Sequence, residues 1–260
     1  MVFAPVGIKC PDHSGVPQGA ARVVQSVTRR SVVGTGALVT KALVGINVAV
    51  FMINLAQGAS LSRNAGSLFF DGALIGRAFD GEGLIGVAEG EWWRLLTAAF
   101  LHGGLIHLGM NMLMLWWIGS PMEESLGRVR FLALYLVAGL AGSAGALLFT
   151  PNAITVGASG AIFGILGAAL VFERQRNYVL GGSALSIIIL NLVFTFAVPN
   201  ISVGGHLGGL AGGALSALAL SRFGTTHASY GRPGVVGVVG LAAVGILSVV
   251  VSLWKVGTLV

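Results

Sequence analysis

Two residues capable of acid–base chemistry interrupt long apolar runs in this sequence. Ser159 stands in the small-residue segment 157–160 (Gly-Ala-Ser-Gly) and is followed by apolar residues as far as Phe172, whereas His206 stands in a later glycine-rich run. Polar groups are costly in hydrocarbon, so they usually serve a function there. A hydroxyl and an imidazole on separate membrane helices can act as a nucleophile and its general base. The pair therefore predicts hydrolysis within the bilayer.

An earlier apolar run carries candidate donors for the same site. His107 and Asn111 are four residues apart, so on a helix they lie on one face, and both side chains can donate hydrogen bonds. Paired donors beside a serine nucleophile would stabilise an oxyanion. Hydrogen bonding between packed helices is the alternative use of these residues. His102 lies five residues before His107, and its polar edge could line a path for water.

Glycines surround both candidate catalytic residues. Gly157 and Gly160 permit a backbone that exposes a hydroxyl at the start of a helix, where free N–H groups point at developing negative charge. Gly205, Gly209 and Gly213 recur every four residues, which gives a face that can pack tightly on another helix. If that helix is the one that starts at the serine, the histidine comes within reach of the hydroxyl.

A catalytic triad and a metal site are both disfavoured by the sequence. No Asp or Glu lies at an apolar membrane depth to orient His206, so we interpret the pair as a dyad. His102 and His107 lack the H-E-x-x-H pattern of zinc peptidases. Cys10 and His13 have the spacing of half a zinc finger without a second pair. We therefore expect no metal and no cofactor.

The composition is that of a polytopic membrane protein. The chain has 260 residues, of which 55% are hydrophobic and 9% charged, and its mean hydropathy is +0.89. A soluble domain carries roughly 25% charged residues. The net charge of +6 could suggest nucleic acid as a partner, but the basic residues form no single patch. We expect a lipid bilayer and membrane proteins as partners, and no nucleic acid.

The predicted fold is all-α, with a soluble tail followed by seven apolar stretches. Residues 1–38 form the tail, and residues 1–36 show no apolar segment with a cleavage site, so no removable signal peptide is expected. Residues 58–103 are mixed in composition and contain a Trp pair, which favours a partly structured segment at the membrane interface. Several stretches are just long enough to cross roughly 30 Å of hydrocarbon; they lie near residues 39–57, 104–120, 130–149, 158–173, 183–198, 205–221 and 234–254.

The distribution of Lys and Arg predicts the orientation. A cytoplasmic N-terminus places eleven of the 15 basic residues inside, in agreement with the positive-inside rule. Only Arg63, Arg77, Arg94 and Lys255 then lie outside. Ser159 and His206 would each begin a span from the outer face of the plasma membrane, so the chemistry would lie just below the extracytoplasmic surface.

With these motifs in place, residues 39–222 resemble a rhomboid intramembrane serine protease. The motifs occur in the family's order: Trp93-Arg94, His107-x3-Asn111, Glu123-x3-Gly127, Gly157-Ala158-Ser159-Gly160, and His206 with Gly209 and Gly213. The resemblance implies a six-helix core, to which residues 223–260 would add a linker and a seventh transmembrane helix. It also implies that transmembrane substrates enter sideways between helices.

The resemblance also implies a role for each site residue. Ser159 would be the nucleophile and His206 the general base, while His107, Asn111 and the Ser159 backbone N–H would hold the oxyanion. Phe163 is a departure, because many relatives have a tyrosine there facing the histidine. Cys10 to His13 resemble the end of an N-terminal zinc-binding module whose remainder is missing.

Two other classes of function use the same residues. A rhomboid-like pseudoprotease would bind membrane proteins without cutting them, but Ser159 and His206 are both intact. A small-solute transporter would use the polar residues as a pathway, but the spans contain no carboxylate to couple transport to protons. The proteolytic interpretation accounts for most of the motifs.

Overall fold

The structure is a computed structural model that describes residues 2–4, 7–9, 36–62, 65–222 and 235–260. The chain divides into two units, Met1–Gly36 and Ala37–Val260. In the first unit, β1 (Val2–Ala4) and β2 (Gly7–Lys9) pair antiparallel, a short hairpin that the sequence did not predict. Cys10 and His13, the fragment discussed as half of a zinc finger, lie outside the described residues.

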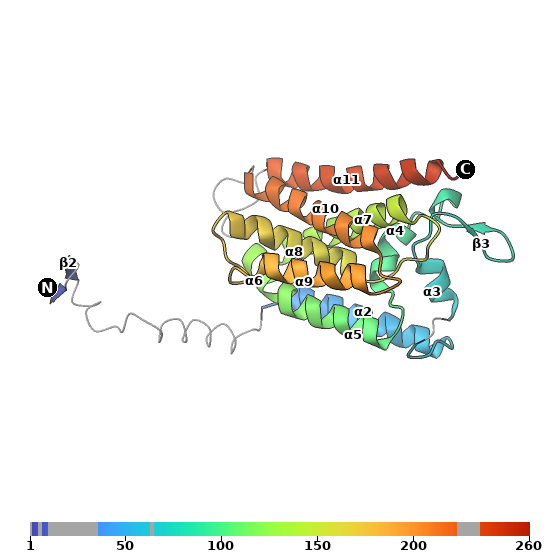
Figure 1. Ribbon diagram of the computed structural model, residues 1–260, viewed down its shortest axis with the longest axis horizontal. Coiled ribbons are helices and arrows are strands. Elements are labelled where there is room, and N and C mark those ends of the chain that lie inside the picture. Colours follow the sequence, from blue (N-terminus) through green and yellow to red (C-terminus); the bar gives the residue numbers. More distant parts are fainter. Residues whose placement is uncertain (1, 5–6, 10–35, 63–64, 223–234) are drawn as a thin grey trace. The chain divides into compact units, whose positions relative to one another are not determined.

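The second unit is a bundle of apolar helices. Figure 1 shows them running side by side along one common direction, with α11 on one flank and α2 and α5 on the other. Each of the seven predicted apolar stretches forms a helix. They are α2 (Leu38–Ala56), α5 (Leu105–Met114) with its continuation, α7 (Arg128–Phe149), α8 (Ser159–Arg174), α9 (Ala184–Ala197), α10 (Val203–Arg222) and α11 (Val235–Gly257).

Not every helix reaches the length of a membrane span. Among the described residues, α2, α7, α10 and α11 are long and apolar enough, and a fifth span results if the pair Arg94–Phe100 and Leu105–Leu126, bent by 92°, counts as one. A span needs about 20 residues, whereas α8 has 16 and α9 has 14. The prediction of an all-helical multi-span membrane protein is therefore confirmed, with four or five candidate spans by length and composition; the number of seven stays a prediction.

The second apolar helix extends beyond its predicted end at residue 120. It passes through a π-helical turn at η4 (Leu115–Gly119) and continues as α6 (Ser120–Leu126). Pro121 directly follows the π-helical turn within this continuous helix, and it lacks the N–H that would bond to the preceding turn. The helix ends at Gly127, whose φ of +80° suits glycine. The helix therefore runs a few residues beyond the apolar stretch predicted near residues 104–120.

Helices α7, α8 and α10 approach one another through glycines. A Cβ at Gly209 would overlap the carbonyl oxygen of Gly160, and one at Gly213 would overlap that of Gly164, so α10 lies directly on α8. On its other side, Gly204 lies against the backbone of Gly145 in α7. Small residues allow this close packing in membranes. The predicted glycine face on α10 is thus packed against the helix that starts at Ser159.

Helix α9 is the most exposed of the inner helices. It packs mainly against α8 and, to a lesser extent, α10. Its outward face is built of large apolar residues that are more than half exposed, among them Leu190, Val193, Phe194 and Phe196. This composition suits contact with lipid. Helix α11 lies on the other flank, against α7 and α10.

Residues 58–103 form the partly structured segment that the sequence predicts. It consists of α3 (Ser67–Gly72), the hairpin of β3 (Ala78–Phe79) and β4 (Leu84–Ile85), η2 (Val87–Glu89), α4 (Arg94–Thr97) and η3 (Ala98–Phe100). At the hairpin turn, the backbone N–H groups of Gly83 and Glu82 donate to the Asp80 carboxylate. These bonds, that from Gly83 with the larger effect, lower the pKa of Asp80 because they favour its ionised form.

The Trp93-Arg94 pair holds this segment together. The Arg94 side chain is 1% exposed; it donates to the carboxylate of Glu91 at 2.7 Å and to the carbonyl oxygens of Phe70 and Ala73. The indole N–H of Trp93 donates to the Asp71 carbonyl at 2.9 Å. Both residues of the pair therefore fasten the end of α3 to α4.

Glu123 ties two helices together at the opposite end of the bundle. Its carboxylate accepts hydrogen bonds from the backbone N–H groups of Val39 and Thr40, at 2.9 and 2.7 Å, and from the Thr40 hydroxyl at 2.8 Å. These N–H groups belong to the first turn of α2, where a helix has no internal acceptor for them. Glu123 thus acts as a cap supplied by another helix.

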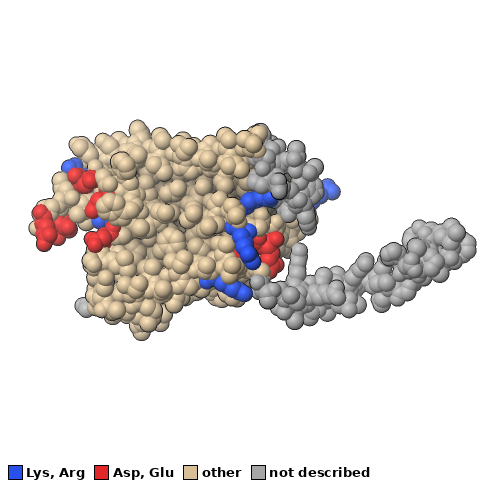
Figure 2. Space-filling model, turned by 180° about the vertical axis from the view of Figure 1, so that it is seen from behind, with Lys and Arg blue, Asp and Glu red and all other residues tan. Residues whose placement is uncertain are grey.

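The Lys and Arg residues of this unit are concentrated at one end of the bundle. Figure 2 shows most of the visible Lys and Arg at the end away from the β3–β4 hairpin, beside a group of Asp and Glu, and further Asp and Glu at the hairpin end. Lys41, Arg128, Arg174 and Arg176 are exposed, and they lie where α2 and α7 begin and α8 ends. The bundle is therefore electrically polarised along its helices.

Candidate active site

Ser159 and His206 meet at the hairpin end of the bundle. Ser159 is the first residue of α8, and His206 lies in the first turn of α10. The serine Oγ and the histidine Nε2 are 2.8 Å apart, which is hydrogen-bond distance. The glycine contacts between α8 and α10 bring the two helix starts together. Proximity of these two residues was expected only if the two helices packed on each other, and they do.

The segment before Ser159 has a conformation that requires glycine. Gly157 has a φ of +124°, a region that other residues rarely adopt, and its N–H donates to the Ala98 carbonyl at 2.9 Å. A Cβ at this position would come within 2.8 Å of the His107 ring. Gly157 therefore lets the ring lie directly against the chain that leads to the serine.

The hydrogen bonds of His107 determine where its proton lies. Its Nδ1 accepts a hydrogen bond from the Gly103 N–H at 3.2 Å. A neutral imidazole that accepts at one nitrogen carries its proton on the other. The Nε2–H of His107 is therefore a donor, and this edge of the ring faces Gly157. His102, 1% exposed, packs edge-on against His107, with ring centroids 5.1 Å apart.

Asn111 is buried one turn further along α5. Its amide donates to the carbonyl oxygen of His107 at 2.9 Å. In this conformation the amide thus braces the backbone of His107. The structure places the His107 ring against the segment that leads to Ser159, and it places the Asn111 amide on the His107 carbonyl.

Two further residues fix the ring of His206. Phe163, from α8, stacks on the imidazole with centroids 4.1 Å apart and an interplanar angle of 17°. The Thr195 hydroxyl, from α9, lies 2.7 Å from Nδ1. The sequence analysis missed Thr195, although Asn191 and Thr195 form a polar pair four residues apart in an otherwise apolar run.

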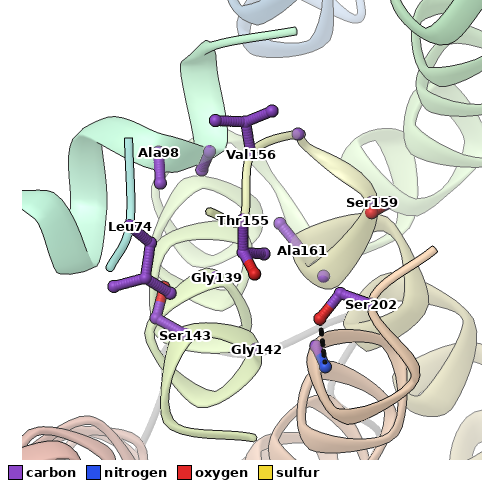
Figure 3. Close-up of a pocket in the computed structure, with 14 residues that line it drawn as sticks. Leu74, Ala98, Gly139, Gly142, Ser143, Thr155, Val156, Ser159, Ala161 and Ser202 are labelled. Atoms are coloured by element: carbon purple, nitrogen blue, oxygen red, sulfur yellow. Dashed lines mark hydrogen bonds between the residues drawn. The ribbon is translucent and has the colours of Figure 1, made fainter. Parts of the chain in front are cut away.

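A small pocket lies beside the start of α8 (Figure 3), between α7, α10 and the segment before the serine. Its volume is about 30 Å³, which is enough for a water molecule. Its walls are mostly Gly, Ala and aliphatic residues, with hydroxyl groups from Ser143, Thr155, Ser159 and Ser202. Ser202 also accepts a hydrogen bond from the Gly205 N–H, which fixes the start of α10.

Three predicted supporting residues make their contacts elsewhere. Trp93 and Arg94 bond to the segment around α3, and Glu123 bonds to the start of α2. They support the fold that carries the site. A hydrogen-bonded serine and histidine within a bundle of apolar helices is the arrangement that hydrolysis of the serine type within a membrane would require.

Comparison with known proteins identifies the family. Residues 89–223 match the model of the rhomboid domain. The chain is 48% identical over 138 residues to the rhomboid protease GluP of Bacillus subtilis, a match that spans 52% of this chain and 27% of GluP. It is 40% identical over 136 residues to the putative rhomboid protease YdcA of the same organism, spanning 50% of this chain and 68% of YdcA. RHOMBOID-like protein 5 of Arabidopsis thaliana is 38% identical over 161 residues, 57% of this chain and 51% of that protein.

The chain belongs to the rhomboid family of intramembrane serine proteases. Its match spans only about a quarter of GluP.

Proposed function

We propose that this chain is an intramembrane serine endopeptidase that hydrolyses peptide bonds in or near transmembrane segments, with Ser159 as nucleophile and His206 as general base. The 2.8 Å contact between the serine Oγ and the histidine Nε2 carries this proposal. Its setting adds support, because both groups lie at helix starts that close glycine packing holds in place.

The chemistry follows from this contact. His206 Nε2 takes the proton of Ser159 as Oγ attacks the carbonyl carbon of the substrate, which gives a tetrahedral intermediate. The intermediate collapses as the imidazolium returns the proton to the leaving amine, and an acyl-enzyme remains. A water molecule, deprotonated by the same nitrogen, then releases the acid and restores the serine.

Three donors would stabilise the oxyanion. The Nε2–H of His107 faces the serine segment, and the Ser159 N–H lies in the first turn of α8, where it has no acceptor in its own helix. Asn111 is the third donor, after its amide turns from the His107 carbonyl toward the substrate. The first two donors are already in place, and donors fixed before the reaction stabilise developing charge without the cost of reorganising solvent.

The pocket beside the serine supports hydrolysis at membrane depth. It has room for about one water molecule and presents hydroxyl groups to it. We propose single-pass or polytopic membrane proteins in the lipid bilayer as substrates. The exposed apolar face of α9 lies next to the site through Thr195, which suits an approach from the side.

The proposed domain organisation is a six-helix catalytic core at residues 39–222 with α11 as a seventh span. Residues 1–38 would be a cytoplasmic tail, as the positive-inside distribution of Lys and Arg indicates. Because the core carries all the groups that the mechanism uses, a chain lacking residues 1–36 should retain proteolysis. A well-folded but inactive truncation would show that the tail takes part in regulation or substrate binding.

We propose that the protein lies in the plasma membrane with its active site toward the outer face. The concentration of Lys and Arg at the end of the bundle away from the hairpin supports this orientation (Figure 2). In a Cys10→Ser background, cysteines at the exposed positions Ser67 and Asn152 should react with a membrane-impermeant thiol reagent on intact cells. A cysteine at the exposed Gln175 should react only after permeabilisation, and the reverse pattern would overturn the orientation.

The direct test of the function compares Ser159→Ala with wild type. The wild-type protein should react with a fluorophosphonate probe and cleave a model transmembrane substrate, and the variant should do neither. Ser252→Ala, which removes a buried hydroxyl on α11, is the matched control and should stay active. Substrate binding without turnover by the wild type would indicate a pseudoprotease, and turnover by folded Ser159→Ala would exclude the serine mechanism.

A further inference from the structure

Thr195 lies at the unreacting nitrogen of the candidate general base. Its hydroxyl is 2.7 Å from His206 Nδ1 and 2.8 Å from the carbonyl oxygen of Asn191. The residue is 2% exposed. Among the described residues, Thr195 is the group that hydrogen-bonds Nδ1, because Phe163 covers a face of the ring and offers no polar atom.

Counting protons distinguishes the two possible arrangements. A threonine hydroxyl has one proton, and the Asn191 carbonyl can only accept. If the hydroxyl donates to that carbonyl, its oxygen must accept from Nδ1–H, and the lone pair on Nε2 then faces Ser159 Oγ. If it donates to Nδ1 instead, Nε2 carries the proton and cannot take another from the serine.

The first arrangement is favoured by the backbone of α9. Threonine hydroxyls in helices commonly donate to the carbonyl four residues earlier, and the 2.8 Å distance to Asn191 matches that bond. The imidazolium formed during catalysis would need an acceptor at Nδ1 as well, and the same oxygen supplies it. The hydroxyl therefore suits both states of the ring.

We propose that Thr195 is a positioning residue that holds His206 in the tautomer with its proton on Nδ1, through the chain from Nδ1–H to the Thr195 hydroxyl to the Asn191 carbonyl. This inference rests on the proposed function of His206 as the base. It assigns to a neutral hydroxyl the orienting task that a carboxylate performs in a catalytic triad.

The kinetic test uses Thr195→Val, which keeps the shape of the side chain and removes the hydroxyl. General-base catalysis contributes about 10²–10⁴-fold, so partial loss of the correct tautomer should lower kcat by about 10–100-fold and leave KM unchanged. Thr195→Ser restores the hydroxyl and should recover most of the loss. Ser252→Ala again controls for the loss of a buried hydroxyl bond to a helix carbonyl.

A spectroscopic test separates this inference from the function itself. In protein labelled with ¹⁵N-histidine, the His206 signals, identified by their absence in His206→Gln, should show a protonated Nδ1 and a bare Nε2. Thr195→Val should shift the ring toward the other tautomer. A wild-type ring protonated on Nε2, or wild-type kcat in folded Thr195→Val, would overturn the proposal. If the wild type showed no Ser159-dependent turnover, the proposed function would fail, while these spectra would still decide the tautomer.

Discussion

The two sides of the helix bundle are packed in different ways. On one side, α7, α8 and α10 touch through glycines, with backbone against backbone. On the other, α2, α5 and α9 present large apolar side chains outward, and Gly45 in α2 has no neighbour within 4 Å of the position of a Cβ. The first side cannot accept an added methyl group at its contacts, whereas the second can.

The residues of the candidate site come from both sides of the bundle. Ser159 and His206 belong to the tightly packed side, where a small displacement would lengthen their contact. His107, Asn111 and Thr195 reach the site from α5 and α9 on the looser side. The proposed catalytic pair is therefore positioned by backbone packing, and the residues proposed to assist it are positioned by side-chain hydrogen bonds.

The largest effect is expected when an assisting donor is removed from the looser side. Asn111→Ala should lower kcat by about 10²–10³-fold, which is the usual cost of one lost oxyanion donor, because His107 and the Ser159 N–H would remain. Steady-state kinetics on a transmembrane substrate measures this loss. An unchanged kcat would restrict Asn111 to bracing the His107 backbone.

A matched pair of glycine substitutions compares the two sides directly. Gly209→Ala places a methyl group on the Gly160 carbonyl, and overpacking of this kind costs about 1–3 kcal/mol. Gly45→Ala meets open space and should stabilise its helix by up to about 1 kcal/mol. Thermal unfolding in detergent reports both. Equal stability of the two variants would contradict the difference in packing.

The smallest effect is expected at the contact between Phe163 and the base. Phe163→Leu keeps an apolar side chain and removes the ring that stacks on His206. Such ring pairs contribute about 0.5–1.5 kcal/mol, so kcat should fall by roughly 10-fold or less. Phe163→Tyr retains the ring and serves as the control. A loss as large as that of Asn111→Ala would show that the ring does more than hold the imidazole in place.

Most of the fold could be predicted because apolar runs and glycine spacing are local signals. The helix boundaries agree within a few residues, and the largest difference is at the second apolar stretch, where the helix continues to Leu126. The number of membrane spans was harder to predict from the sequence, because α8 and α9 form apolar helices that are shorter than a span. The pairing of β1 with β2 follows no alternation long enough to be recognised.

The candidate site could be predicted where its residues belong to recognisable motifs, as Ser159, His206 and His107 do. The hydrogen-bond partner of His206 Nδ1 was sought among carboxylates. Thr195, a threonine in an apolar run, was therefore overlooked. The conformation of Asn111 could not be predicted either, since the sequence does not show whether its amide faces the His107 carbonyl or the oxyanion position. Hydrogen-bond partners are decided by tertiary packing, and spacing alone does not contain them.

The cap on α2 has a consequence for how the chain is made. Ribosomes synthesise Val39 and Thr40 well before Glu123, which lies 84 and 83 residues later. When the first helix enters the membrane, the acceptor for its leading N–H groups does not yet exist, and water must serve in its place. The helix can take its final contacts only after the end of α6 has emerged and folded back to it. A change such as Glu123→Gln would therefore act on biogenesis, lowering the yield of inserted protein more than the turnover of each finished molecule.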